Sequence, residues 1–273
     1  ISQKCKDAIV DQFRDRTGQR PSIDKAHPDL RINIHIDKDQ VSVALDTSGN
    51  SLHQRGYRSA TNIAPINEVL AAGILLLSGW DGQTDFLDPM CGSGTFLIEA
   101  SMMELNQMPG LRRKFGFENW KNLDSKLLKQ IKSAYESEKK SLTFSRIYGS
   151  DKDLRAIRVA KRNLVEAGLE EAVQLVCKKI TEITPPFNEG VMITNPPYGI
   201  RIGEDEELAE AYPLWASCLK NKFSGWRTYF LTSDFRLPKL MRLSPSKKTP
   251  LYNGALDCRL FEIKMVAGSN RKK

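Results

Sequence analysis

The sequence predicts an α/β fold in which helices cover both faces of a mostly parallel β-sheet. Over most of the 273 residues, short apolar runs typical of buried strands alternate with longer stretches of helical periodicity. A glycine-rich turn at residues 88–95 follows one run and precedes a helical stretch, which is the layout of a nucleotide-binding site in an open parallel sheet. The last run, at residues 257–266, alternates apolar with polar side chains, so one of its faces should be more exposed to water.

Three shorter elements precede this pattern. Residues 1–16 space their apolar side chains like one face of a helix. Residues 30–36 and 41–45 each alternate apolar and polar side chains, and the turn at 37–39 between them predicts a hairpin. One helix and one hairpin bury too little apolar surface to close a core by themselves. A polar connector then runs over residues 47–65.

The remaining elements follow in the order expected of an α/β domain over residues 66–273. A mainly apolar helix at 67–77 should pack beneath the glycine-rich turn. An insertion at 101–145 interrupts the alternation and carries a charged helix over about residues 124–140. The strands are expected at 84–88, 146–151, 172–177, 190–195, 226–232 and 257–266, with helical stretches between them.

The glycine-rich turn suits a ligand that carries a cationic group. Gly92 and Gly94 allow the backbone to approach a ligand closely, and the helix after them presents free N–H groups. A dinucleotide-binding turn would have a third glycine where Leu97 stands, and the carboxylate of Asp88 adds negative charge beside the loop. S-adenosylmethionine (SAM) has a cationic amino group and no phosphate, so it fits better; an ordinary tight turn is the alternative. The candidate cofactor residues here are Asp88, Pro89, Cys91, Gly92, Gly94 and Thr95.

A second carboxylate, Asp151, ends the expected strand at 146–151. An acidic residue at this point commonly accepts hydrogen bonds from ribose hydroxyls. In a compact dinucleotide fold it lies about 20 residues beyond the first strand, whereas here the insertion at 101–145 intervenes. The alternative is that Asp151 caps the helical stretch at 154–164. Together with the glycine-rich turn, the ribose-binding interpretation is favoured.

The catalytic candidates lie in the segment Asn195-Pro196-Pro197-Tyr198, which follows the apolar run at 190–193. Two consecutive prolines hold φ at about −65° and donate no backbone hydrogen bond, so the Asn195 side-chain oxygen and the Pro196 carbonyl can be held out as acceptors. Acceptors that converge on a planar amine, beside an aromatic ring that stacks on its base, are suited to base modification. We therefore expect Tyr198 to stack on the target base and Asn195 also to contact the cofactor. The alternative is a tight turn that leaves a strand.

These motifs make the chain similar to the methyltransferase domain of the THUMP-containing RNA guanine-N2 methyltransferases, and within that family to the bacterial enzymes that act on large-subunit ribosomal RNA. The similarity covers roughly residues 20–266. It is carried by residues 56–58, 64–68, 88–95, 195–201 and 251–260. Where relatives often have an acidic residue that contacts the cofactor adenine, this chain has Cys177-Lys178-Lys179, so that contact is expected from backbone groups or from Glu182.

The resemblance implies a Rossmann-like class I SAM-dependent methyltransferase with a seven-stranded, mostly parallel sheet whose last strand is antiparallel. It implies methyl transfer from SAM to the exocyclic N2 of a guanine in 23S ribosomal RNA, free or in an assembling large subunit, without a metal. It also implies that residues 1–46 are the closing part of an α+β THUMP module, the family's RNA-binding module, whose first part lies upstream.

Two other functions remain open at this point. Adenine-N6 methyltransferases share the segment 195–198, so this motif by itself is equally compatible with an adenine target in RNA or DNA. A protein that binds SAM and RNA without turnover is the third hypothesis, although the intact Asn195 and Asp88 argue against it.

The formal net charge of +8 favours a polyanionic partner such as RNA. The insertion contributes a basic and aromatic cluster at 111–117, and a second basic cluster precedes Tyr252. The cluster at 111–117 could instead be a solvated loop whose phenylalanines cover the domain surface. The candidate RNA contacts are Arg58, Arg112, Arg113, Lys114, Arg201, Arg242, Lys247 and Lys248.

The five cysteines are scattered, with no CxxC pair and no nearby histidine, so neither a zinc site nor a disulfide framework is indicated. No signal peptide is evident, and no apolar run approaches the roughly 20 residues that a membrane span needs. The sequence therefore predicts a soluble, cytoplasmic protein.

Overall fold

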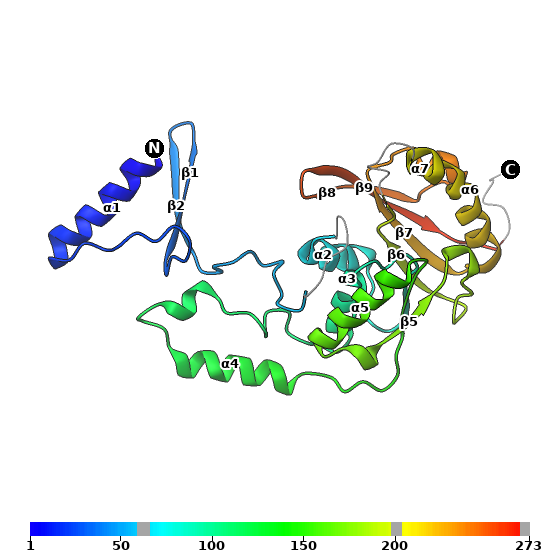
Figure 1. The fold of residues 1–273 in the computed structure, drawn as a ribbon, viewed down its shortest axis with the longest axis horizontal. Helices are drawn as coiled ribbons and strands as arrows, with labels where there is room; N and C mark the ends of the chain where they lie inside the picture. The colour runs from blue at the N-terminus through cyan, green and yellow to red at the C-terminus, as the bar shows by residue number, and fades with distance from the viewer. Residues whose placement is uncertain (59–65, 198–203, 268–273) are drawn as a thin grey trace. The chain divides into compact units, whose positions relative to one another are not determined.

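The computed structural model describes residues 1–58, 66–197 and 204–267, and the chain divides into two compact units (Figure 1). The smaller unit contains residues 1–51 and 114–124. The larger unit contains residues 52–113 and 125–273.

The smaller unit is built from a helix and a hairpin, close to the ranges that the sequence predicts. Helix α1 (Ser2–Thr17) ends at Gly18, and strands β1 (Arg31–Asp37) and β2 (Gln40–Asp46) pair antiparallel. A short 3-10 turn, η1 (Gly116–Asn119), belongs to this unit, because the backbone N–H of Phe117 donates to the Thr47 carbonyl at 3.0 Å. The sequence predicts this turn within the insertion at 101–145 of the larger domain, whereas the structure groups it with the smaller unit.

The larger unit contains the seven-stranded sheet. Its strands lie in the spatial order β5-β4-β3-β6-β7-β9-β8, the first five being parallel and β9 antiparallel to β7. The predicted mostly parallel sheet with an antiparallel last strand is confirmed. The strands are β3 (Asp85–Asp88), β4 (Ile147–Asp151), β5 (Val173–Cys177), β6 (Gly190–Thr194), β7 (Trp226–Thr232), β8 (Lys247–Asn253) and β9 (Leu256–Lys264).

Strand β8 is not among the strands that the sequence predicts. Its residues include two lysines and Pro250, a composition that indicates a polar turn rather than a strand. The structure pairs β8 with β9 at the edge of the sheet, with Pro250 opposite Arg259. An edge strand tolerates proline, because the missing N–H need not bond to a neighbouring strand.

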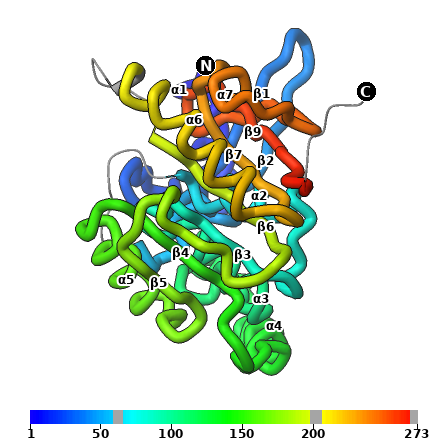
Figure 2. Tube along the Cα trace, turned by 90° about the vertical axis from the view of Figure 1, so that its right-hand side faces the viewer, coloured from blue at the N-terminus to red at the C-terminus, as the bar shows by residue number. Residues whose placement is uncertain are grey.

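Helices cover both faces of this sheet (Figures 1 and 2). One core packs α2 (Glu68–Ser78), α3 (Thr95–Glu104) and α5 (Leu154–Ala167) against one face. The other core packs α6 (Glu204–Lys222) and α7 (Leu237–Met241) against the opposite face. In the insertion, α4 (Ser125–Ser137) has no buried residue. Two 3-10 turns, η2 (Glu170–Ala172) and η3 (Ile180–Glu182), flank β5.

The strand order reverses at β3, which has β4 on one side and β6 on the other. In open α/β sheets, ligands bind beyond the carboxyl ends of the strands at such a reversal. Helix α3 packs closely on the sheet here, although it lacks the third glycine of a dinucleotide-binding turn. Gly149 of β4 makes room for the Leu97 side chain, since a Cβ at Gly149 would meet it. The close approach therefore depends on a glycine in the strand. The carboxyl ends of β3, β4 and β6, where the strand order reverses, are the candidate site.

Candidate active site

Asp88, the last residue of β3, lies on the floor of the candidate site. Its side chain is only 2% exposed, and Oδ1 accepts hydrogen bonds from the Thr194 hydroxyl at 2.8 Å and from the Met90 backbone N–H at 3.1 Å. Burial raises the pKa of Asp88 to about 7, against the lowering effect of those two hydrogen bonds. No ion pair to Asp88 is present within the described part of the chain. A buried carboxyl group that titrates near neutrality is suited to a cationic ligand group.

The glycine-rich turn is held by backbone contacts to the neighbouring strand and helix. Cys91 N–H donates to the Ser150 carbonyl at 2.9 Å, and the Asn163 amide of α5 donates to the Ser93 carbonyl at 3.0 Å. Gly92 and Gly94 both have positive φ, at 53° and 82°, and a Cβ at Gly94 would lie 3.1 Å from Cβ of Ala160. Both glycines are therefore required by the backbone conformation of the turn.

Pro89, Cys91 and Thr95, the other predicted cofactor residues of the turn, are buried. Burial also raises the pKa of the Cys91 thiol well above its usual range. A thiol that stays protonated is a poor nucleophile, so Cys91 packs in the turn rather than offering chemistry.

Asp151, at the end of β4, bonds the glycine-rich turn directly. Its Oδ2 accepts from the Gly92 N–H at 3.0 Å, and its Oδ1 accepts from the Asp153 N–H at 2.9 Å. The N-cap of α5 is Asp153, whose carboxylate accepts from the Arg155 N–H at 2.8 Å. The alternative that Asp151 caps this helix is therefore wrong, and its half-buried carboxylate keeps further lone pairs for a ligand.

Asn195 follows directly after the last residue of β6, Thr194. Because Thr194 is fully buried and its hydroxyl bonds Asp88, the two predicted functional residues are joined through one side chain. Asn195 is half-buried, Pro196 is buried and Pro197 is exposed. Tyr198 and Arg201 lie outside the described residues.

Arg58, predicted as an RNA contact, has its guanidinium occupied within the protein. Nε donates to Glu68 of α2 at 2.7 Å, and Nη1 and Nη2 donate to Ser93 Oγ at 3.3 Å and Thr95 Oγ1 at 3.0 Å. Nη2 also donates to the Ile66 carbonyl at 3.3 Å. The guanidinium therefore links α2 to the glycine-rich turn.

A second buried group lies beside this one on α3. Glu99 is 1% exposed and accepts hydrogen bonds from Arg55 Nε at 3.3 Å and from the Tyr57 hydroxyl at 3.2 Å. Burial raises the pKa of Glu99 and the pKa of Tyr57. The sequence does not predict the ion pairs of Glu68 and Glu99, because a glutamate in an apolar helix gives no indication of its partner.

The other described candidates for RNA contact fall into two groups. Arg113 is buried, with 9% of its surface exposed, so little of its side chain is accessible to an RNA strand at the surface. The remainder are exposed: Arg112, Lys114, Arg242, Lys247 and Lys248. Lys114 belongs to the smaller unit and the other four to the larger one.

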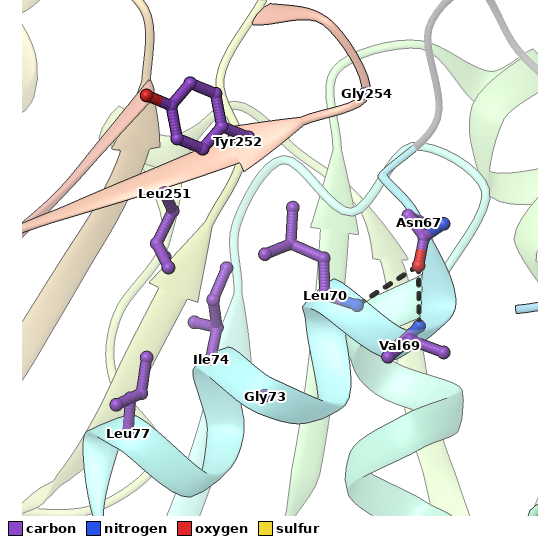
Figure 3. A pocket seen from close by; sticks show the side chains of 9 residues that line it. All are labelled: Asn67, Val69, Leu70, Gly73, Ile74, Leu77, Leu251, Tyr252 and Gly254. Atoms are coloured by element: carbon purple, nitrogen blue, oxygen red, sulfur yellow. Dashed lines mark hydrogen bonds between the residues drawn. The ribbon is translucent and has the colours of Figure 1, made fainter. Parts of the chain in front are cut away.

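A hollow on the larger unit lies between α2 and the β8–β9 hairpin (Figure 3). Ile74 and Leu251 line it, and the Tyr252 ring lies on the other side of the strand from Leu251. At its end, Asn67 caps α2 by accepting from the Val69 and Leu70 N–H groups (Figure 3). None of the predicted cofactor residues lines this hollow.

The segment Cys177-Lys178-Lys179, which stands where relatives often have the acidic adenine contact, begins at the last residue of β5. The Lys178 N–H donates to the Asp151 carbonyl at 3.0 Å. Glu182 Oε2 accepts from the Lys179 N–H at 3.1 Å, which fixes one of its carboxylate oxygens. Among the described residues, no group of three or more His, Cys, Asp or Glu side chains could hold a metal ion. The described helices include none that is both long and apolar enough to cross a membrane.

Comparison with known families and proteins is consistent with this geometry. A family model described as "RMKL-like, methyltransferase domain" matches residues 55–262, and a THUMP domain model matches residues 1–46. The ribosomal RNA large subunit methyltransferase K/L of Shewanella frigidimarina is 40% identical over 98% of this chain. The chain spans 38% of the length of that relative.

Two solved structures share the fold over nearly the whole chain. SMU.472, provisionally assigned as a methyltransferase and complexed with SAH, has a TM-score of 0.87 and 34% identity over 97% of this chain and 70% of its own. A predicted N6-adenine-specific DNA methylase from Listeria monocytogenes has a TM-score of 0.86 and 32% identity over 95% of this chain and 67% of its own.

Proposed function

The chain belongs to the RMKL-like methyltransferase family and matches a THUMP domain at residues 1–46, and we propose that it methylates the N2 amine of a guanine in 23S ribosomal RNA with SAM. One observation carries the proposal. Asp88, the glycine-rich turn and Asn195 lie at the carboxyl ends of adjacent strands, where the strand order reverses.

The residues of the turn fit SAM. Asp88 is a buried carboxyl group that would accept hydrogen bonds from a cationic amino group, and Asp151 offers half-buried oxygens to a ribose. Arg58, which bonds the side chains of the turn, is already paired with Glu68, so its charge is not directed at a phosphate. The similarity to SMU.472, solved with SAH, the demethylated form of SAM, supports the same assignment. When bound, SAM would supply an electrophilic methyl group.

The protein's own contribution to the transfer is positioning and electrostatics. The Asn195 side-chain oxygen and the Pro196 carbonyl would accept the two protons of the target amine as positive charge develops on its nitrogen. Dipoles held in place before the reaction stabilise this charge more in the transition state than in the ground state. After transfer, the amine loses one proton to solvent. A strong general base is not required.

A paired guanine must leave its helix to reach Asn195. Unstacking costs a few kcal/mol, about what one aromatic contact returns, because base–aromatic stacking is worth roughly 1–3 kcal/mol. Tyr198 follows Pro197 directly and would supply that contact.

The second candidate target is adenine N6, and the similarity to the Listeria protein favours it as the alternative. The catalytic residues would be the same, because both reactions methylate a planar exocyclic amine. The THUMP match and the ribosomal RNA methyltransferase relatives support RNA as the substrate class.

Substitution of Tyr198 is predicted to separate stacking from hydrogen bonding. Tyr198→Ala should lose transfer, whereas Tyr198→Phe should stay largely active, because the aromatic ring provides most of the contact with the base. Initial rates with saturating SAM would measure both. An inactive phenylalanine variant would mean that the hydroxyl takes part.

Cofactor affinity is predicted to depend on the protonation of Asp88. Since the pKa of Asp88 is raised to about 7, the group is protonated below this pH and then offers less to a cationic amino group. The affinity for SAH should therefore fall as the pH is lowered from about 7.5 to about 5.5. Calorimetry at several pH values would measure this, with Asp88→Asn as the control that removes the dependence. An affinity that is flat over this range in the unaltered protein would contradict it.

The proposed class is tested by incubating the protein with methyl-labelled SAM and either ribosomal RNA or duplex DNA. We expect label in the RNA and none in the DNA. Label in DNA alone would favour an adenine-directed enzyme. Binding of SAM without transfer to either polymer would support a binding protein.

A further inference from the structure

The four hydrogen bonds of Arg58 give this residue a different role from the RNA contact that the sequence suggests. We propose that Arg58 is a positioning residue that holds the glycine-rich turn in its cofactor-binding conformation. This inference rests on the proposed function, because it assumes that the turn binds SAM.

The geometry places the guanidinium between three segments of the chain. One edge pairs with Glu68 in the first turn of α2, and the other reaches Ser93 and Thr95 of the glycine-rich turn. The Ile66 carbonyl before α2 takes a further bond. Arginine has five N–H donors in a planar fork, and four different acceptors use them here.

Burial makes these bonds costly to lose. The side chains of Arg58 and Glu68 are 16% and 6% exposed, so neither charge is well solvated without the other. Ser93 and Thr95 are 5% and 3% exposed, and their hydroxyls also bond each other at 3.3 Å. Loss of the guanidinium would leave the buried acceptors on Glu68, Ser93 and Thr95 without this donor.

The turn is thereby held from both sides. Asn163 and Asp151 bond its backbone from the α5 and β4 side, and Arg58 bonds its side chains from the α2 side. Gly92 and Gly94 add conformational freedom, since both occupy the left-handed region. A turn with two glycines needs such contacts to keep its backbone in one conformation.

Arg58→Lys tests the proposal, because lysine keeps the charge opposite Glu68 but cannot reach the four acceptors together. We expect the Kd for SAH to rise about tenfold, as for the loss of one or two net hydrogen bonds. The kcat at saturating SAM and the KM for RNA should stay within about twofold of the unaltered protein, because the turn is restored when the ligand fills the site.

The matched control is Arg155→Lys, since the side chain of Arg155 on α5 is 87% exposed. It should leave the Kd for SAH unchanged. If Arg58→Lys does not fold, Glu68→Gln provides a second variant that keeps an acceptor oxygen for Arg58 while weakening the pair. It should raise the Kd in the same direction.

The outcomes separate this inference from the proposed function. If the unaltered protein binds SAH and the Arg58→Lys variant binds it equally well, Arg58 has no positioning role; a raised KM for RNA in that variant would restore the RNA-contact assignment. Failure of the unaltered protein to bind SAH would overturn both the inference and the proposed cofactor.

Discussion

Asn195→Ala is expected to reduce methyl transfer by about 10²–10³-fold or more while leaving the affinity for SAH nearly unchanged. The reason is that its side-chain oxygen accepts an amine proton most strongly when charge develops on the nitrogen, so the contribution belongs to the transition state. The residue directly follows β6, and the backbone of that strand is fixed by its pairing with β3 and β7. The substitution should therefore alter the chemistry and spare the fold.

Single-turnover rates with saturating SAM and RNA, together with calorimetry of SAH, would measure this separation. Asn221→Ala is a suitable control, because Asn221 is an exposed asparagine on α6 whose amide bonds only Ser217 among the contacts described. Near-normal turnover of the Asn195→Ala variant would remove Asn195 from the catalytic assignment.

Asp88→Asn has the second large expected effect, a loss of cofactor affinity of about 10–100-fold near pH 8, which is the scale of a hydrogen bond to a charged group. Asparagine keeps an oxygen for the bonds from Thr194 and Met90 and removes only the charge. Because burial penalises that charge, the apo variant should be no less stable than the unaltered protein. Asp88→Ala should also weaken binding, with an added cost from the lost hydrogen bonds.

Asp85→Asn is the matched control for this substitution. Asp85 begins the same strand, is 4% exposed and has a pKa raised by burial, but it lies at the opposite end of β3 from the glycine-rich turn. Calorimetry of SAH should show no change in this variant. Equal affinities of the Asp88→Asn variant and the unaltered protein would show that the carboxylate does not bind the cofactor.

Local patterns predicted the fold well wherever a single segment carries the information. The strand that ends at Asp88 and the helix after Asn67 follow from apolar runs and their flanking residues, and both lie close to the expected ranges. Strand β8 escaped prediction because Pro250 argues against a central strand, and the sequence alone does not tell an edge from a centre.

The candidate site was less predictable where residues act through distant partners. Leu97 excluded a dinucleotide-binding turn, but only the structure shows that Gly149, 52 positions further along the chain, makes room for the Leu97 side chain. Arg58 has the composition of an RNA contact, whereas its partners Glu68, Ser93 and Thr95 become evident only once α2 and the turn are placed side by side. Such pairings depend on tertiary structure, which a local pattern does not contain.

Identification of the methylated nucleoside is the measurement that decides whether guanine N2 is the target. Unmodified 23S ribosomal RNA would be incubated with SAM and the protein, then digested to nucleosides for mass spectrometry. N2-methylguanosine is the expected product, and it should be lost in the Asn195→Ala variant. N6-methyladenosine would contradict the guanine assignment, and the absence of any methylated nucleoside would contradict the proposed activity.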